Sequence, residues 1–163
     1  MRVALRLIVI FGFLPGMART QCSIDSSHLE FPYSKAALVA RNAFVESVCS
    51  DSNTELIDLT DPTLKGRLER PSKAVRIDAR DPYPVEARRY GYEGKPVVAY
   101  VLDASGAVGK AVVIETSGNR ILDQAAMASV KQWRYSRPAA LDGKPIRALV
   151  YSPVIFTLRG RLR

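Results

Sequence analysis

The sequence predicts an α+β fold in which a small three-stranded antiparallel sheet is covered by a helix, with a helical N-terminal extension. Three observations predict it. Valine-rich runs at 95–102 and 108–115 flank the turn sequence Asp103-Ala104-Ser105-Gly106. Residues 119–133 carry apolar side chains at helical spacing, and 147–158 form a final apolar run. Together with a short helix ahead of the first strand, the expected order is α-β-β-α-β.

The C-terminal elements have clear boundaries. Pro84 suits the first turn of a short helix over 85–90, and Gly91 suits its end. Asn119 is a suitable N-cap for the covering helix. One apolar stripe of that helix is expected to hold Leu122, Ala126, Val130 and Trp133. The Asp142-Gly143 pair predicts a turn before the last strand.

The region ahead of these elements is patterned more weakly. Residues 34–49 predict a helix capped by Ser34, with one apolar face made of Ala37, Leu38, Phe44, Val45 and Val48. Residues 54–72 contain Pro62, Gly66 and Pro71 and are typical of a linker. From 73 to 79, apolar and polar residues alternate, as in an extended arm. We therefore expect three parts: 1–18, 19–72 and 73–163.

The first eighteen residues predict a cleaved secretory signal peptide. Arg2 and Arg6 precede eight uninterrupted apolar residues from Leu7 to Leu14, and small residues lead to a cleavage site after Ala18. A membrane-spanning helix needs about 20 apolar residues, which this segment does not reach. We expect a periplasmic protein, and an uncleaved anchor in the inner membrane remains the alternative. Membrane contact is expected only in that second case.

Two cysteines, Cys22 and Cys49, remain after the predicted cleavage. An even cysteine count in an exported chain favours a disulfide. Such a bridge would join the mature N-terminus to the end of the first predicted helix, and two free thiols are the alternative.

The sequence offers no pattern for catalysis, a metal or a cofactor. Its one histidine, His28, lies in a polar stretch, and a zinc or iron site needs three or four ligands at suitable spacing. Neither a nucleophile elbow nor a phosphate-binding glycine loop is present. We expect a protein that is not an enzyme and holds no cofactor. The net charge of +8 suits an anionic partner, but nothing resembles a nucleic-acid module.

The order of motifs from Tyr83 to Leu158 closely resembles the C-terminal domain of the TonB family. The resemblance is carried by Tyr83-Pro84, Gly91-Tyr92-Glu93-Gly94-Lys95, Val130-Lys131-Gln132-Trp133-Arg134-Tyr135 and the final strand. It implies pairing of that strand with an extended TonB-box peptide of an outer-membrane transporter. The implied partner-binding residues are Tyr83, Pro84, Leu149, Val150, Tyr151 and Ser152. The implied structural residues are Trp133, Tyr135, Gly94, Gly106 and Gly143.

The last strand is also a candidate binding surface for a physical reason: the free backbone groups of an edge strand can pair with an extended peptide. Pro153 fits an edge strand better than a central one. If the edge is open, replacing Val150 with proline should abolish peptide binding and spare the fold. The edge is equally well explained as capped by the 73–79 arm or by a second copy of the domain.

Two features differ from a force-transducing TonB protein: the hydrophobic segment is short, and residues 19–81 hold only Pro32, Pro62 and Pro71. The leading hypothesis is a periplasmic TonB-like module that binds an outer-membrane TonB-dependent transporter or another envelope protein. The alternatives are an inner-membrane-anchored energy transducer, and a basic scaffolding protein that binds peptidoglycan or anionic lipid and self-associates.

Overall fold

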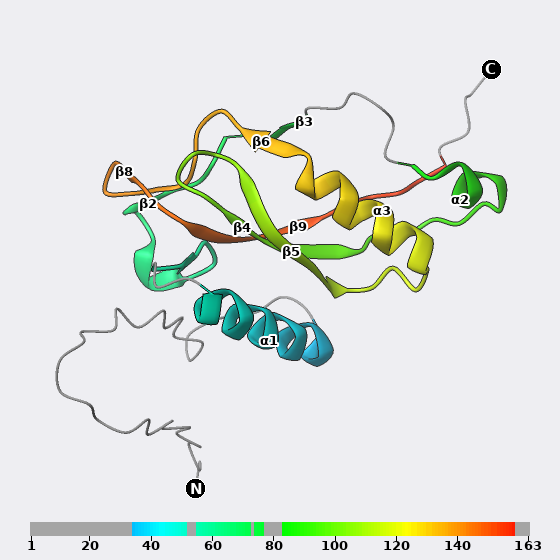
Figure 1. Ribbon diagram of the computed structural model, residues 1–163, viewed down its shortest axis with the longest axis horizontal. Coiled ribbons are helices and arrows are strands. Elements are labelled where there is room, and N and C mark those ends of the chain that lie inside the picture. Colours follow the sequence, from blue (N-terminus) through cyan, green and yellow to red (C-terminus); the bar gives the residue numbers. More distant parts are fainter. Residues whose placement is uncertain (1–33, 52–54, 73, 77–82, 159–163) are drawn as a thin grey trace, which may run out of the picture.

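The structure is a computed structural model that describes residues 34–51, 55–72, 74–76 and 83–158. At its centre is a four-stranded sheet in the order β1-β9-β4-β5 (Figure 1). Its strands are β1 (Ile57–Asp58), β4 (Val97–Leu102), β5 (Val108–Glu115) and β9 (Ala148–Pro153). Strands β5 and β9 run antiparallel to β4, as predicted, and β1 runs parallel to β9. The α+β fold class is confirmed, and the sheet has one strand more than expected.

Helices cover both faces of this sheet. Helix α3 (Arg120–Lys131) lies on one face and α1 (Lys35–Asp51) on the other, while α2 (Val85–Arg89) lies at one end of the sheet (Figure 1). Asn119 caps α3 as predicted, because its side chain accepts a hydrogen bond from the Ile121 amide at 2.9 Å.

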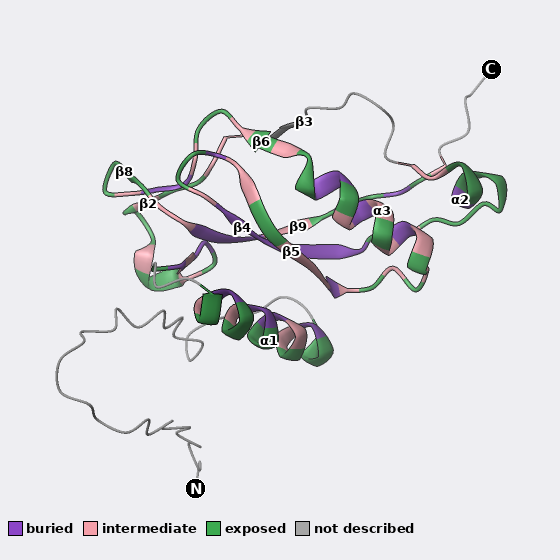
Figure 2. Ribbon diagram, in the orientation of Figure 1, coloured by how far each residue is buried: buried purple, intermediate pink, exposed green. Residues whose placement is uncertain are grey.

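Two apolar layers follow from the alternation of side chains along β4. The even-numbered side chains Val98, Tyr100 and Leu102 pack with the α3 stripe of Leu122, Ala126 and Val130. The odd-numbered side chains Val97, Ala99 and Val101 pack with the α1 stripe of Ala37, Phe44 and Val48. All six residues of β4 are therefore buried, which Figure 2 shows as a purple strand between the two helices.

Short strands flank the central sheet. Strands β2 (Leu68–Glu69), β7 (Ala140–Leu141) and β8 (Lys144–Pro145) form one small sheet, and β3 (Ala74–Arg76) pairs with β6 (Trp133–Tyr135). A 3-10 helix, η1, covers Pro62–Leu64. The predicted linker 54–72 thus supplies β1, η1 and β2. The described part of the predicted arm, β3, pairs with β6 and does not cap β9.

One helix boundary differs from the prediction. Helix α3 ends at Lys131, so Trp133 is not part of its apolar stripe but begins β6. Trp133 and Tyr135 are aromatic residues, which favour strands. The pairing of this segment with β3 outweighs the helical spacing of Trp133 relative to the α3 stripe. The Trp133 ring still packs against the α3-side core and meets the Tyr100 ring edge-on, with centroids 6.1 Å apart.

The three glycines expected at structural positions lie at turns or close approaches. Gly106 has a φ of 82°, and a Cβ there would collide with the carbonyl oxygen of Tyr135. Gly143 follows Asp142 in the two-residue turn between β7 and β8, where both residues have positive φ. Gly94 forms a bridge with Phe156.

Candidate functional site

The candidate site is the outer edge of β9, on the side away from β4. Along an antiparallel strand, the backbone groups of successive residues point alternately to the two sides. The amides of Val154 and Phe156 donate to the carbonyls of Pro96 and Gly94, each at 2.9 Å. Even-numbered residues of this segment therefore face the β4 side, and odd-numbered residues face the edge.

The first part of this edge is occupied by the chain itself. The amide of Ile57 donates to the carbonyl of Arg147 at 3.1 Å, and the amide of Leu59 donates to the carbonyl of Leu149 at 3.2 Å. These bonds make β1 a parallel neighbour of β9. The edge is closed at residues 147–149 by a segment that the sequence pattern assigned to a linker.

The last part of the edge has a different character. Ile155 and Thr157 are exposed, and the Ile155 residue keeps 64% of its accessible surface. Their amides point to the edge, and no backbone acceptor for them lies within the described parts of the chain. Between the two parts, Pro153 has no amide hydrogen to offer. Residues 155–157, which follow β9, thus form the segment whose geometry suits an added strand.

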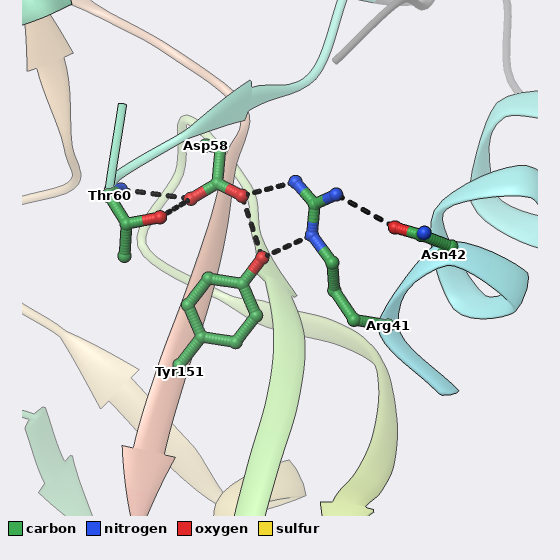
Figure 3. Close-up of polar contacts among 5 residues, drawn as sticks. All are labelled: Arg41, Asn42, Asp58, Thr60 and Tyr151. Atoms are coloured by element: carbon green, nitrogen blue, oxygen red, sulfur yellow. Dashed lines mark hydrogen bonds and ion pairs between the residues drawn. The ribbon is translucent and has the colours of Figure 1, made fainter. Parts of the chain in front are cut away.

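A buried polar cluster holds β1 beside β9 (Figure 3). The Arg41 guanidinium on α1 lies 2.7 Å from the Asp58 carboxylate on β1. The Tyr151 hydroxyl on β9 donates to the same carboxylate at 2.7 Å and accepts from Arg41 Nε at 2.9 Å. Arg41 is 1% exposed and Asp58 3% exposed. We call Arg41, Asp58 and Tyr151 the clamp, because they join three elements.

Further hydrogen bonds complete the clamp. The second carboxylate oxygen of Asp58 accepts from the amide of Thr60 at 2.9 Å and from its hydroxyl at 2.7 Å. Arg41 Nη1 donates to the side-chain oxygen of Asn42 at 2.9 Å. A buried ion pair is tolerated when its remaining hydrogen-bonding groups are also satisfied, and this pair meets that condition.

The clamp is electrostatically fixed near neutral pH. Burial raises the pKa of Tyr151, and the negative charge of Asp58 raises it further. Burial alone would lower the pKa of Arg41, but its hydrogen bonds to Tyr151 and Asp58 outweigh that effect and raise the pKa. Tyr151 therefore stays neutral and Arg41 stays charged in the physiological range.

The four predicted partner-binding residues on β9 have their side chains engaged within the domain. Leu149 and Val150 are buried, Tyr151 belongs to the clamp, and Ser152 Oγ lies 3.0 Å from the Tyr100 hydroxyl. Contact with an added peptide would involve the backbone here. The even number of Val150 directs its amide to β4, so a proline there would break the β4–β9 ladder. The expectation that this substitution spares the fold is wrong.

Tyr83 lies near the end of the same strand. Its ring meets the Phe156 ring edge-on, with centroids 5.5 Å apart, and its hydroxyl donates to the carbonyl of Tyr92. The Arg88 guanidinium lies 5.4 Å from the centre of the Tyr83 ring. Pro84 is the N-cap of α2. The structure thus places Tyr83, but not the side chain of Pro84 by any described contact, against Phe156, which follows β9.

Sequence reasoning missed Arg41 and Asp58. The available signal was an arginine inside an apolar stripe, because Ala37, Arg41, Phe44 and Val48 follow helical spacing. An arginine at such a position needs a buried acidic partner. The helical spacing alone could not show that this partner is Asp58, from the segment predicted to be a linker.

Some predicted features lie outside the described residues. Cys49 lies on α1, but Cys22 does not belong to the described ranges, so the disulfide stays a prediction. His28 and the signal segment also fall outside them. Within the described ranges, no cluster of three or more metal-ligating side chains occurs, and no helix has the length and hydropathy to cross a bilayer.

The fold and the site define a small α+β domain whose last strand lies beside a partly closed sheet edge. Residues 79–158 match the sequence family described as Gram-negative bacterial TonB protein C-terminal. This part of the chain belongs to that family, the TonB C-terminal domains, which is associated with TonB-dependent transport. The recognition made from the sequence is confirmed.

Curated relatives match about half of the chain. Protein TonB of Vibrio cholerae is 40% identical over 86 residues, which are 53% of this chain and 35% of that protein. Protein tonB2 of Pseudomonas aeruginosa is 37% identical over 76 residues, 47% of this chain and 28% of that protein. The chain thus spans about a third of the length of the curated relatives it matches.

One solved structure aligns with a larger share of the chain. The solution structure of the Pseudomonas aeruginosa TonB C-terminal domain aligns with 64% of this chain and 95% of its own, at 22% identity and a TM-score of 0.45. Helix α1 and β1 precede the segment that matches the family.

Proposed function

We propose that the C-terminal domain binds an extended, TonB-box-like peptide of an outer-membrane transporter or another envelope protein. The peptide would add beside residues 155–157, which follow β9. The observation that carries this proposal is the outward direction of the Ile155 and Thr157 amides, for which the described chain provides no backbone acceptor. Main-chain hydrogen bonds of this kind supply affinity in strand addition. The function is binding in support of TonB-dependent transport, not catalysis.

The location that fits this role is the periplasm. The support is the predicted signal peptide, together with the membership of residues 79–158 in a Gram-negative family. If the N-terminal segment is retained as an inner-membrane anchor, the same domain would serve an energy transducer. Mass spectrometry of the mature N-terminus after fractionation of the cell envelope separates these two roles.

The experiment that tests strand addition compares two substitutions at one exposed position. Ile155→Pro removes an amide donor that faces the edge and leaves the described β4–β9 hydrogen bonds in place. Ile155→Thr keeps the donor and removes apolar surface. Titration calorimetry with a synthetic TonB-box peptide should show binding to the natural chain and to the threonine variant, and loss of binding in the proline variant. Equal affinity for all three chains would refute edge pairing.

The scaffolding role has one supporting observation of its own. Helix α2 and the turn after it expose Val85, Arg88, Arg89, Tyr90 and Tyr92, and the two tyrosine rings stack with centroids 5.7 Å apart. Arginines beside exposed rings suit contact with anionic lipid or peptidoglycan, and the exposed Glu86 and Glu93 reduce the positive charge of the same surface. Co-sedimentation with anionic vesicles and with peptidoglycan, at low and high salt, tests this role. Salt-sensitive sedimentation combined with no response to TonB-box peptides would favour it over peptide binding.

A further inference from the structure

We infer that β1 is a register stop on the β9 edge: it confines an added peptide to the part of the edge beyond Tyr151. The inference rests on the proposed function of the same edge. It assigns a role in specificity to residues that precede the family domain, because β1 and α1 lie ahead of residue 79.

The first step of the argument is occupancy. An added strand must lie about 4.8 Å from β9 in the plane of the sheet, which is the position that β1 already fills. The edge-facing carbonyls of Arg147 and Leu149 already accept from the amides of Ile57 and Leu59. A peptide cannot pair with residues 147–149 unless β1 leaves.

The second step is the path of the chain after β1. The amide of Asp61 donates to the carbonyl of Asp58 at 3.2 Å, so the chain turns immediately after the strand. Helix η1 then begins at Pro62. Thr60, within the turn, is fixed by two hydrogen bonds to Asp58. The stop is therefore a short, tied turn and not a long strand that a peptide could displace gradually.

The third step is the strength with which β1 is held. Removing β1 would separate Asp58 from a buried arginine and from the Tyr151 hydroxyl. Arg41 would then remain buried beside the sheet without its counter-charge, which is strongly unfavourable. In return, a peptide would gain only the backbone groups that the two-residue strand β1 releases, among them the carbonyls of Arg147 and Leu149. A peptide that keeps to residues 155–157 avoids that loss.

The test is amide hydrogen exchange, followed by NMR on the full chain with and without a synthetic TonB-box peptide. The expected result is slower exchange at Ile155 and Thr157, with unchanged exchange at Ile57 and Leu59. Faster exchange at Ile57 and Leu59 in the presence of the peptide would mean that β1 is displaced. That outcome overturns the register stop and leaves strand addition standing. If Ile155 and Thr157 gain no protection, the proposed function is overturned and the stop with it.

A pair of variants provides a second measurement. Asp58→Ala removes the carboxylate that fixes β1 to Arg41 and Tyr151 and is expected to release β1 from the edge, whereas Asp51→Ala removes only a surface ion pair. A peptide lengthened at the end nearest Tyr151 should bind the Asp58→Ala variant about fivefold more tightly than the short peptide does, the effect of roughly one hydrogen bond. The natural chain and the Asp51→Ala variant should bind both peptides equally. An equal gain in all three chains, or no gain in the Asp58→Ala variant, contradicts the stop. If Asp58→Ala does not fold, the exchange pattern of the natural chain decides.

Discussion

Helices α3 and α1 cover opposite faces of one sheet, but different interactions hold them. The α3 face combines a continuous apolar stripe with tyrosines, and its core includes Leu122, Val130 and Tyr100. The α1 face has a smaller apolar layer and places a buried ion pair, Arg41–Asp58, where α3 has only apolar and small polar residues.

The two faces therefore lose stability in different ways when a side chain is removed. An apolar face loses stability in proportion to the volume removed, and neighbouring side chains relax to reduce the loss. A face held by a buried ion pair fails when one partner is lost, because the other charge cannot relax into a favourable state. The α1 face also fixes β1 on the β9 edge, so its failure would change the candidate site as well as the stability.

The largest effect is expected from Asp58→Ala. The substitution leaves Arg41 buried without its counter-charge and should lower the free energy of unfolding by about 3–5 kcal/mol. Urea denaturation of the purified full chain measures this change. Asp51→Ala is the matched control, because Asp51 pairs with Lys110 at the surface, and its loss should be at most about 1 kcal/mol. Similar losses in both variants would remove the distinction between the buried clamp and a surface pair.

On the other face, Leu122→Ala should lower the free energy of unfolding by about 2–5 kcal/mol, because this side chain is fully buried between α3 and β4. Hydrogen exchange measured residue by residue distinguishes the opening of one face from the opening of the other. Asp58→Ala should accelerate exchange mainly in α1 and β1, and Leu122→Ala mainly in α3. Uniform acceleration in both variants would show that the two faces open as one unit.

Each face also holds a tyrosine whose pKa burial raises, Tyr100 on the α3 side and Tyr151 on the α1 side. The folded state keeps these hydroxyls protonated at a pH where the unfolded chain loses the proton. Stability is thus complete below the unfolded pKa of about 10 and falls as the pH rises above it, by about 1.4 kcal/mol per pH unit for each tyrosine. Urea denaturation between neutral and alkaline pH measures the slope. Burial raises the pKa of Tyr135 as well, so Tyr151→Phe should remove roughly a third of the slope, and an unchanged slope would contradict this assignment.

The smallest effect is expected at an exposed pair that belongs to neither face. Arg67 and Asp142 join β2 to the β7–β8 turn, with side chains 58% and 52% exposed. Arg67→Met should leave the urea midpoint unchanged within error, because a solvated ion pair contributes little. A clear fall in the midpoint would show that an exposed pair can match the buried clamp.

The two faces also differ in how far the sequence could predict them. The α3 side follows local rules: Asn119 caps the helix, Gly106 permits the hairpin turn, and the apolar stripe has helical spacing. Strand β1 follows none of them, because a two-residue strand is too short for a periodic pattern. Its place is determined by the pairing of Asp58 with Arg41, a tertiary contact.

Only part of the candidate site, likewise, could be predicted from the sequence. The apolar last strand and Pro153 indicated an edge strand, but that prediction is wrong for β9, which lies between β1 and β4. The closed part of the edge was not predictable, since the segment that closes it has the composition of a linker. The direction of each amide required the register, which places Val150 opposite Tyr100 and turns the odd-numbered residues outward.

The clamp also has a kinetic consequence. The two hydrogen bonds of Tyr151 within the clamp join residues 93 and 110 positions apart in the sequence, whereas the β4–β5 hairpin closes across a short turn. Contacts between such distant positions carry a larger loop-closure entropy, so they are expected to form after the hairpin and after the folding transition state. Interactions that are absent from the transition state slow unfolding without accelerating folding. The clamp is therefore expected to lower the unfolding rate more than it raises the folding rate.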